Sequence, residues 1–373
     1  MVGAVPAEPT EKRVSWAELF FDLVFVFAVT EVSALLTSDH SWAGTGRALV
    51  VFVPIYWAWV GTSIQANVHD MTGPLSHLAI FTVALSGLVM ALCVTQAYGD
   101  RGLLFACAYW AARLSLGVRL FASGLVLNPY TVSMFGTGPL LIAGALLPSG
   151  PREVVWLVAA LADLSSPTLL RSRLRGMHFD AGHLTERFGL FVLIALGESV
   201  VRIGEPAATS DRLGVAAVAA VVAAFVVTCA LWWVYFFYAA DAMRFALATA
   251  AVQLSVTRHV LSYGHLCFIA AVIAVAVGMT ETIAYPGRQL EWGTVALLYG
   301  GTALYLATFG YTRWMMFRLF SSTRVVGAVV VLAALPLARL VPALAATTLL
   351  AVLLVGLNRV EYLRVRSAST PSG

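Results

Sequence analysis

Three carboxylates lie within one apolar stretch of the sequence, residues 18–36. They are Glu18, Asp22 and Glu31. As a helix this stretch would be roughly 28 Å long, which matches the hydrocarbon core of a bilayer. A carboxylate inside that core costs about 2.5–3.5 kcal/mol even on the lenient insertion scale, so three in one helix indicate a polar site. Glu18 and Asp22 are four residues apart and would share one helix face.

A second apolar stretch, residues 184–203, carries Glu186 near its start and Glu198 near its end. Arg202 follows Glu198 by four residues, and this spacing suits a local ion pair that neutralises itself. Gly197 beside Glu198 would let another helix approach closely, which favours a functional role for this carboxylate. The predicted transport or ion site therefore contains five carboxylates: Glu18, Asp22, Glu31, Glu186 and Glu198.

Two arginines inside the apolar stretch 102–124, Arg113 and Arg119, are the candidate charge partners of Asp22. An arginine near the middle of a membrane needs a carboxylate as much as the carboxylate needs the arginine. The alternative is a buried ion pair that only fixes helix packing, because membrane bundles also use polar groups in this way.

Two histidines, His77 and His265, each lie near the start of an apolar stretch. They are candidate proton-relay groups, since histidine titrates near neutral pH; the alternative is that each is a hydrogen-bonded interface residue. The four cysteines lie in apolar runs without metal-ligand spacing, so we expect no metal site. We expect no cofactor and no enzyme, because the chain has no P-loop, dinucleotide fingerprint or zinc-binding His-Glu-x-x-His motif. An intramembrane lipid-modifying enzyme that uses His and Glu stays open as an alternative.

The composition is that of an integral membrane protein. Hydrophobic residues make up 60% of the chain and charged residues 11%, and the mean hydropathy is +0.87. A soluble domain carries about 25% charged residues. The net charge of +4 is weak evidence for nucleic-acid binding, so the expected partners are membrane lipids and a small solute or ion.

The predicted fold class is all-α, a polytopic membrane helix bundle with about twelve transmembrane helices. The predicted spans are residues 18–36, 47–67, 76–97, 102–124, 130–147, 153–171, 184–203, 212–239, 258–281, 292–314, 325–341 and 343–361. We divide the chain into an N-terminal tail, a first six-helix repeat, a basic loop, a second six-helix repeat and a C-terminal tail, at residues 1–17, 18–171, 172–183, 184–361 and 362–373.

The basic residues predict the orientation of the chain. Arg171, Arg173 and Arg175 lie close together in the central loop, which is the firmest cytoplasmic anchor under the positive-inside rule. With an even number of spans, both termini would then be cytoplasmic. The predicted location is the cell membrane, that is the bacterial inner membrane, with multiple passes.

Four pairs of landmarks occur in the same order in the two halves of the chain and predict an internal repeat. They are Glu18 and Glu186, Glu31 and Glu198, Trp57 and Trp232, and His77 and His265. Six helices per half would make the repeat parallel, with the two halves in the same orientation. Glu186 and Arg187 lie near the predicted cytoplasmic surface of the membrane, where long charged side chains can reach water at little cost. Only the repeat therefore makes them candidates for a function.

Two stretches of the sequence resemble the signatures of a known family. They are Glu18-Leu-Phe-Phe-Asp22-Leu-Val-Phe-Val and Glu186-Arg-Phe-Gly-Leu-Phe-Val-Leu-Ile-Ala-Leu-Gly197-Glu198-Ser. Both are similar to signature stretches of the bacterial low-temperature-requirement A family, and His183 also fits. The resemblance covers nearly the whole chain. It supports the topology more than a mechanism, because the biochemical activity of that family is not established.

Three functions fit these expectations. A secondary transporter is the first, with proton coupling through the buried carboxylates as one form of it; the spans, the repeat and the paired acids favour it. A cation channel is the second, because Phe20-Phe21-Asp22 is loosely similar to the Phe-Ser-Asp element of lysosomal-type potassium channels. A membrane scaffold or lipid-handling protein in cold adaptation is the third. A cavity lined by the carboxylates would favour transport, a continuous pore the channel, and a dry core with every charge paired the scaffold.

Overall fold

The computed structural model describes residues 12–69, 73–122, 127–174, 176–208 and 214–369. Within these residues the chain is all-α, and its one β-bridge, between Gln289 and Pro342, is isolated. The α-helices are α1 (Trp16–Ser38), α2 (Trp42–Val68), α3 (Pro74–Cys93), α4 (Gly102–Ala122), α5 (Pro129–Val132), α6 (Gly138–Ala145), α7 (Ser149–Leu169), α8 (Ala181–Ala208), α9 (Val215–Val234), α10 (Ala240–Thr249), α11 (Gln253–Val256), α12 (His265–Ala284), α13 (Trp292–Val295), α14 (Gly301–Phe317), α15 (Ser322–Leu340) and α16 (Ala343–Ser369).

Short helical segments of other kinds interrupt or extend these helices. One is a 3₁₀ helix, η1 (Val94–Gln96), and four are π-helices: η2 (Ser133–Thr137), η3 (Tyr235–Ala239), η4 (Thr257–Gly264) and η5 (Ala296–Gly300). Segments of π-helix are rare, and they occur frequently at functional sites.

Seven helical segments in the described part of the chain are long and apolar enough to cross a membrane. They are Trp16–Ser38, Trp42–Val68, Pro74–Gln96, Val215–Thr249, Gln253–Ala284, Ser322–Leu340 and Ala343–Ser367. Each of the twelve predicted ranges overlaps a helix of the structure. A helical membrane bundle is therefore confirmed, whereas the count of twelve crossings stays a prediction.

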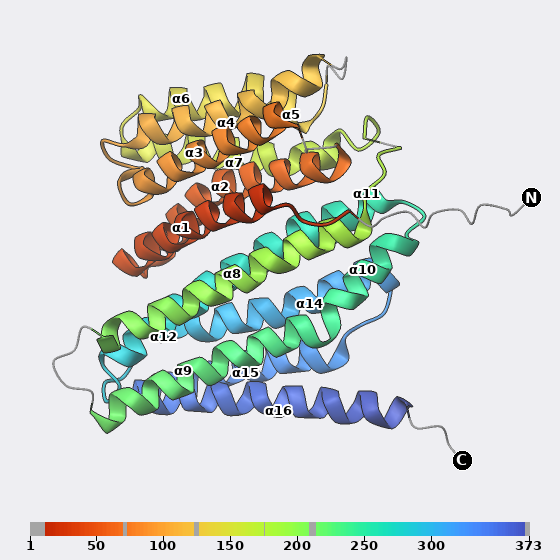
Figure 1. The fold of residues 1–373 in the computed structure, drawn as a ribbon. Coiled ribbons are helices and arrows are strands. Elements are labelled where there is room, and N and C mark those ends of the chain that lie inside the picture. Colours follow the sequence, from red (N-terminus) through yellow and green to blue (C-terminus); the bar gives the residue numbers. More distant parts are fainter. Residues whose placement is uncertain (1–11, 70–72, 123–126, 175, 209–213, 370–373) are drawn as a thin grey trace, which may run out of the picture.

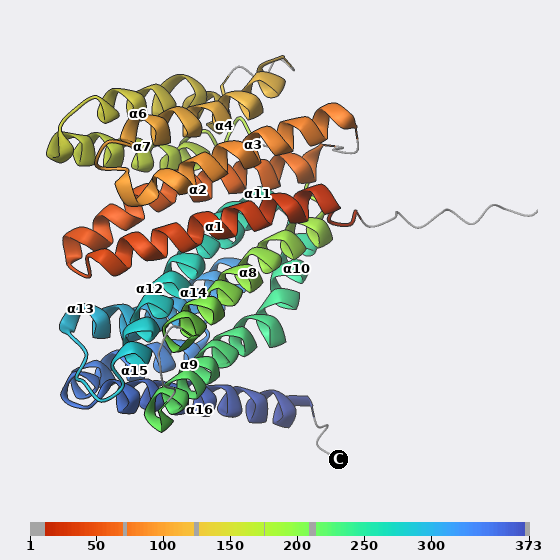
Figure 2. The same ribbon diagram turned by 60° about the vertical axis from the view of Figure 1, so that its left-hand side comes forward.

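The helices lie side by side as two groups, α1–α7 and α8–α16 (Figures 1 and 2). Contacts between the groups run chiefly from α1 and α2 to α8 and α12. Helices α1 and α8 run in the same direction along this interface (Figure 1). The inter-group interface is therefore where polar residues of the two halves can meet.

The starts of α1 and α8 are both fixed by side-chain caps. Ser15 and Glu18 form a capping box at α1, in which each side chain binds the backbone N–H of the other residue. At α8 the Asp180 carboxylate accepts a hydrogen bond from the His183 backbone N–H at 2.9 Å. These caps set the rotation with which each helix begins, and so determine which side chains face the interface.

Candidate functional site

Four residues of α1 and α8 form a buried charge cluster at the inter-group interface: Glu18, Asp22, His183 and Arg187. Glu18 is 2% exposed and the other three are completely buried. The two acids are four residues apart on α1, and the two basic residues are four apart on α8. Equal spacing on two helices that run in the same direction lets the two pairs face one another.

Arg187 joins the two carboxylates of the charge cluster. Its Nη1 donates to Glu18 Oε1 at 2.9 Å and its Nη2 donates to Asp22 Oδ1 at 2.6 Å. The guanidinium also lies over the rings of Phe21 and Trp59, with 5.6 and 5.9 Å from Cζ to the ring centroids. Each of these contacts favours a charged arginine at this buried position.

Asp22 is only partly satisfied by its neighbours. Its Oδ1 accepts hydrogen bonds from Arg187 and from Trp59 Nε1, the latter at 2.7 Å. Its Oδ2 is buried and has no hydrogen-bond partner among the described residues. A buried carboxylate oxygen without a partner is costly when it is ionised, and it is a place where a proton can bind.

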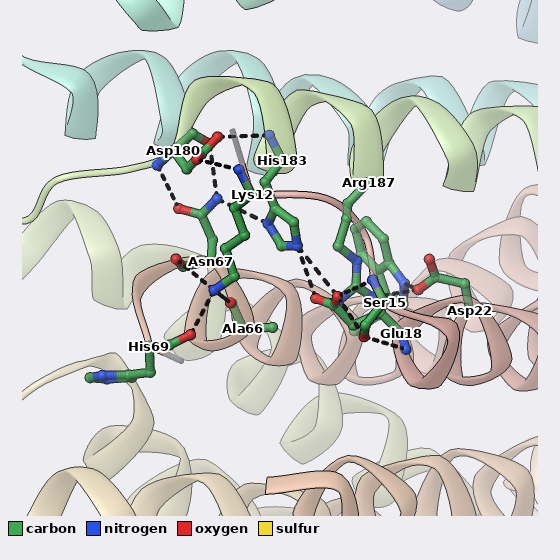
Figure 3. A network of polar contacts seen from close by, with 11 residues as sticks. Lys12, Ser15, Glu18, Asp22, Ala66, Asn67, His69, Asp180, His183 and Arg187 are labelled. Carbon is green, nitrogen blue, oxygen red and sulfur yellow. Dashed lines mark hydrogen bonds and ion pairs between the residues drawn. The ribbon is translucent and has the colours of Figure 1, made fainter. Parts of the chain in front are cut away.

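His183 is held in one tautomer by Asn67. The backbone N–H of Asp180 donates to Asn67 Oδ1 at 3.0 Å, and Asn67 Nδ2 donates to the Asp180 carbonyl at 2.9 Å, which orients the amide. The same Nδ2 lies 3.1 Å from His183 Nδ1, so that ring nitrogen accepts. The imidazole proton is therefore on Nε2, which lies 3.1 Å from Glu18 Oε1 (Figure 3).

The charge cluster carries more negative than positive charge when both acids are ionised. Two carboxylates face one guanidinium, and His183 in this hydrogen-bonding pattern is neutral. Lys12 does not supply the missing positive charge, because its Nζ donates to the carbonyls of Ala66, Asn67 and His69 at the end of α2 (Figure 3). One proton on a carboxyl group would make the cluster neutral.

The prediction that Arg113 pairs with Asp22 was wrong, and the same prediction for Arg119 is not tested. Arg113 lies outside the charge cluster, where it donates to the Trp57 carbonyl and to Ser133 Oγ. Arg119 lies in α4, and its side chain is outside the described residues. Arg187 takes the role because it lies on the face of α8 that packs against α1.

Two of the five predicted carboxylates, Glu18 and Asp22, converge on one site. Glu186 does not, because the residue before Arg187 is turned about 100° away from it around α8. Its side chain is exposed and lines a separate surface groove with Asp241. Glu31 is half-buried further along α1 and is not part of the charge cluster. Glu18 and Glu186 are therefore not equivalent in this structure.

Glu198 forms the local pair with Arg202 that the spacing predicted, at 3.1 Å from Nε to Oε1. Arg202 Nη2 also donates to the Thr30 carbonyl of α1. This second contact between α1 and α8 lies further along both helices than the charge cluster. The expectation for Gly197 was wrong, since a Cβ at that position would meet no atom within 4 Å.

The two predicted proton-relay histidines are not part of the charge cluster. His265 is buried and lies 2.6 Å from the Tyr235 hydroxyl through Nε2, while its Nδ1 lies 3.1 Å from the Val260 carbonyl. His77 is half-buried, with its ring 6.5 Å from that of Phe81. No described contact joins the two.

Sequence reasoning missed three residues of the site: His183 as a hydrogen-bond donor, Arg187 as the charge partner, and Trp59 as a donor to Asp22. A signal for the first two was available. An acid pair at i and i+4 on one apolar helix can be satisfied by a basic pair at the same spacing on another, and Arg187 is fully buried only because it has such partners.

A second buried polar group surrounds Asp163 of α7. Its Oδ1 accepts from Ser133 Oγ and Thr137 Oγ1, each at 2.8 Å, and its Oδ2 accepts from the Tyr109 hydroxyl. Arg113 reaches the same Ser133 hydroxyl at 2.7 Å, so its charge is balanced by Asp163 across one side chain. In the part of the chain that is described, no group of three or more His, Cys, Asp or Glu side chains could hold a metal ion.

Comparison with known proteins agrees with the resemblance noted in the sequence. The family described as "Bacterial low temperature requirement A protein (LtrA)" matches residues 13–358. An uncharacterized protein of Rhizobium meliloti (strain 1021) is 29% identical over 321 residues, which cover 82% of this chain and 77% of that protein. No solved structure matches the chain. Because the family match spans nearly the whole sequence, the chain belongs to the bacterial low temperature requirement A (LtrA) family.

Proposed function

We propose that the chain is a proton-coupled secondary transporter for a small solute or ion, and that Asp22 carries the proton. The observation that carries this proposal is the surplus of negative charge in the buried charge cluster, together with Asp22 Oδ2, which has no hydrogen-bond partner among the residues that the structure describes. Buried ionisable groups inside a membrane are expensive and commonly mark proton or ion pathways. The proposal assigns no catalytic step to these residues.

The proton would act on the contact between the two helix groups. With Asp22 ionised, the surplus charge attracts a proton or a cation to the interface of α1 and α8. With Asp22 protonated, the charge cluster is neutral and its attraction to Arg187 weakens, because one of the two ion pairs becomes an ordinary hydrogen bond. Proton binding would therefore bias the relative position of the two groups, as alternating access between two halves requires.

The topology of the proposed transporter follows the predicted one: about twelve spans in a parallel repeat of six and six, with both termini cytoplasmic. Helix α1 begins and α16 ends at the same end of the bundle (Figure 1), which supports an even number of crossings. The packing of α1 against α8 agrees with the predicted repeat, whereas the different burial of Glu18 and Glu186 does not. Reporter fusions after Arg175 and after Arg366 should both give cytoplasmic signals.

Proton flux in proteoliposomes tests the proposed function. The intact protein would be reconstituted with a trapped pH-sensitive dye, and internal pH followed while pools of small solutes are added outside. We expect at least one pool to drive proton movement that Asp22→Asn abolishes. The matched control is Glu153→Gln, which removes a carboxylate from a surface ion pair with Arg47 and should leave the flux unchanged.

Other outcomes of the same experiment would contradict transport. A steady ion current at constant pH, independent of any added solute, would indicate the cation channel. An equal flux in Asp22→Asn and the intact protein would exclude Asp22 as the proton carrier. If no pool moves protons and Asp22→Asn only lowers the melting temperature, the charge cluster holds the helices together, as in a scaffold or lipid-handling protein.

A further inference from the structure

A pocket lies between α2, α5, α7 and η4, away from the charge cluster. Its volume is about 70 Å³, and its walls are almost entirely apolar. Ile64, Leu174 and Phe179 form part of its apolar wall, and the side chains of Arg113 and Arg258 also line it. It adjoins an open groove of about 620 Å³, and the two share Met177, Leu254 and Arg258 as walls. Arg258 therefore lies at the junction between an apolar pocket and a groove that opens to the surface.

Arg258 is buried without a carboxylate partner. It is 9% exposed, and no Asp or Glu among the described residues comes within ion-pair distance of it. Its Nη1 lies 3.4 Å from the Pro167 carbonyl, its Nη2 lies 3.3 Å from His259 Nε2, and its Nε has no hydrogen-bond partner in the described part of the chain. An unpaired guanidinium in an apolar setting is costly, and an anion would lower that cost.

The other arginine of the pocket, Arg113, has an acid close by. Arg113 Nε also lacks a hydrogen-bond partner among the described residues, and no described carboxylate lies within ion-pair distance of it. Its Nη2 nevertheless donates to Ser133 Oγ, which donates to Asp163 Oδ1, so Arg113 faces a carboxylate across one side chain, and the surplus positive charge of the pocket is that of Arg258. Of the described residues, the groove outside adds Arg171 and His178 to the lining and no acidic side chain. The whole recess therefore offers positive charge to a ligand that enters from the surface.

The position of Arg258 on η4 adds a second, independent observation. The segment Thr257–Gly264 is π-helical over eight residues, and such segments occur frequently at functional sites. It presents Arg258 toward α7 through the contact with Pro167.

We infer that this recess binds an organic phosphate, with the phosphate at Arg258 and a short apolar body in the pocket. A phosphate monoester carries about −1.5 to −2 charge at pH 7, which suits Arg258 with Arg171 and His178 nearby better than a monoanion does. The apolar walls formed by Ile64, Leu174 and Phe179 favour a ligand with an apolar group over inorganic phosphate. The site is distinct from the charge cluster and does not depend on proton transport.

Binding of butyl phosphate to the full-length protein in phosphatidylcholine nanodiscs tests this site. We expect saturable binding by isothermal titration, weaker by about tenfold or more for inorganic phosphate and for Arg258→Gln. Arg258→Lys should retain part of the affinity. The matched control is Arg173→Gln. Arg173 is an exposed arginine of the segment between α7 and α8, and it does not line the recess, so this variant should bind butyl phosphate like the intact protein.

Two further arms identify the source of the ligand and guard against misfolding. Nanodiscs that contain phosphatidic acid should displace butyl phosphate if a lipid headgroup occupies the recess, and should not displace it if the natural ligand is a soluble phosphate. Leu254→Trp, which keeps every charge and fills the shared wall, should also lose binding while its melting temperature stays near that of the intact protein. The inference would be overturned if Arg258→Gln bound butyl phosphate as tightly as the intact protein does. It would also be overturned if inorganic phosphate and butyl phosphate bound with equal affinity, or if neither butyl phosphate nor phosphatidic acid bound.

Discussion

Nη2 of Arg187 on α8 lies 2.6 Å from Oδ1 of Asp22 on α1, and both side chains are completely buried. The same guanidinium holds Glu18 at 2.9 Å, so one arginine from the second half of the chain joins two acids from the first. The contact between the halves therefore includes buried charges near the starts of both helices, where burial limits the screening of charge by water. The balance of charge at this point decides both its stability and what it can bind.

Removing the arginine should be the most damaging single change in the charge cluster. Arg187→Gln would leave two carboxylates buried without a cation, and we expect the free energy of unfolding to fall on the order of 3–5 kcal/mol. Thermal melting in detergent measures this. The control Arg47→Gln removes an exposed arginine that pairs with Glu153 and should cost less than about 1 kcal/mol.

A double variant separates charge from packing at the same position. Arg187→Gln combined with Asp22→Asn removes one positive and one negative charge, so it should recover part of the stability that Arg187→Gln loses. Equal melting temperatures for the single and the double variant would show that the loss comes from packing against Phe21 and Trp59 rather than from charge.

The tautomer of His183 gives a second prediction. Asn67 donates to Nδ1, so ¹⁵N NMR of labelled histidine should show His183 with its proton on Nε2 at neutral pH. Asn67→Asp would replace that donor by an acceptor, and we expect both ring nitrogens of His183 to become protonated. A proton on Nδ1 in the intact protein would contradict the hydrogen-bond network around Asp180 and move the proposed proton site from Asp22 to His183.

Much of the fold follows from the sequence because apolar length is a strong signal. The helix α1 was predicted as residues 18–36 and runs from Trp16 to Ser38, with its start set by the capping box of Ser15 and Glu18. The number of crossings is harder to establish. Helix α8 is not among the seven segments because it carries several charged residues, although Arg187 is neutralised by α1 and Glu198 pairs with Arg202 of α8 itself.

The site was half predicted, for an identifiable physical reason. Glu18 and Asp22 stood out because burying them needs compensation, but the sequence does not say which cation supplies it. Arg113 is buried to nearly the same extent as Arg187, but it faces Asp163 across the Ser133 hydroxyl instead of Asp22. The choice between two equally buried arginines depends on which helices pack together, and that is a property of the tertiary structure.

Close packing between α12 and η5 gives a third prediction. A Cβ at Gly278 would lie 2.7 Å from Leu298 Cβ and 3.1 Å from its backbone, so Gly278→Ala should lower the free energy of unfolding by about 1–3 kcal/mol. Gly197→Ala is the matched control, because nothing lies within 4 Å of the added methyl group. There the gain in helix propensity should stabilise the protein by about 0.5–1 kcal/mol. Equal effects of the two substitutions on thermal melting would contradict the predicted contact.

The last prediction compares two carboxylates of the α1–α8 interface. Asp22 lies in a cluster with surplus negative charge, whereas Glu198 neutralises one arginine. Asp22→Asn removes the surplus negative charge and keeps an oxygen that can accept from Arg187 and Trp59. Its amide nitrogen would take the place of Oδ2, which already lacks a partner among the described residues, so no new group is left unsatisfied. Glu198→Gln instead removes the one carboxylate found beside Arg202 in the described structure.

The same chemical change should therefore have opposite consequences at the two positions. We expect Asp22→Asn to keep the melting temperature of the intact protein and to lose solute-driven proton flux, because the group that takes up the proton is gone. We expect Glu198→Gln to keep the flux and to lower the free energy of unfolding on the order of 1–3 kcal/mol, because the charge of Arg202 loses its partner. Proton flux in liposomes and thermal melting would be measured on both variants. A loss of stability without a loss of flux in Asp22→Asn would mean that the charge cluster holds α1 and α8 together and that the proton binds elsewhere.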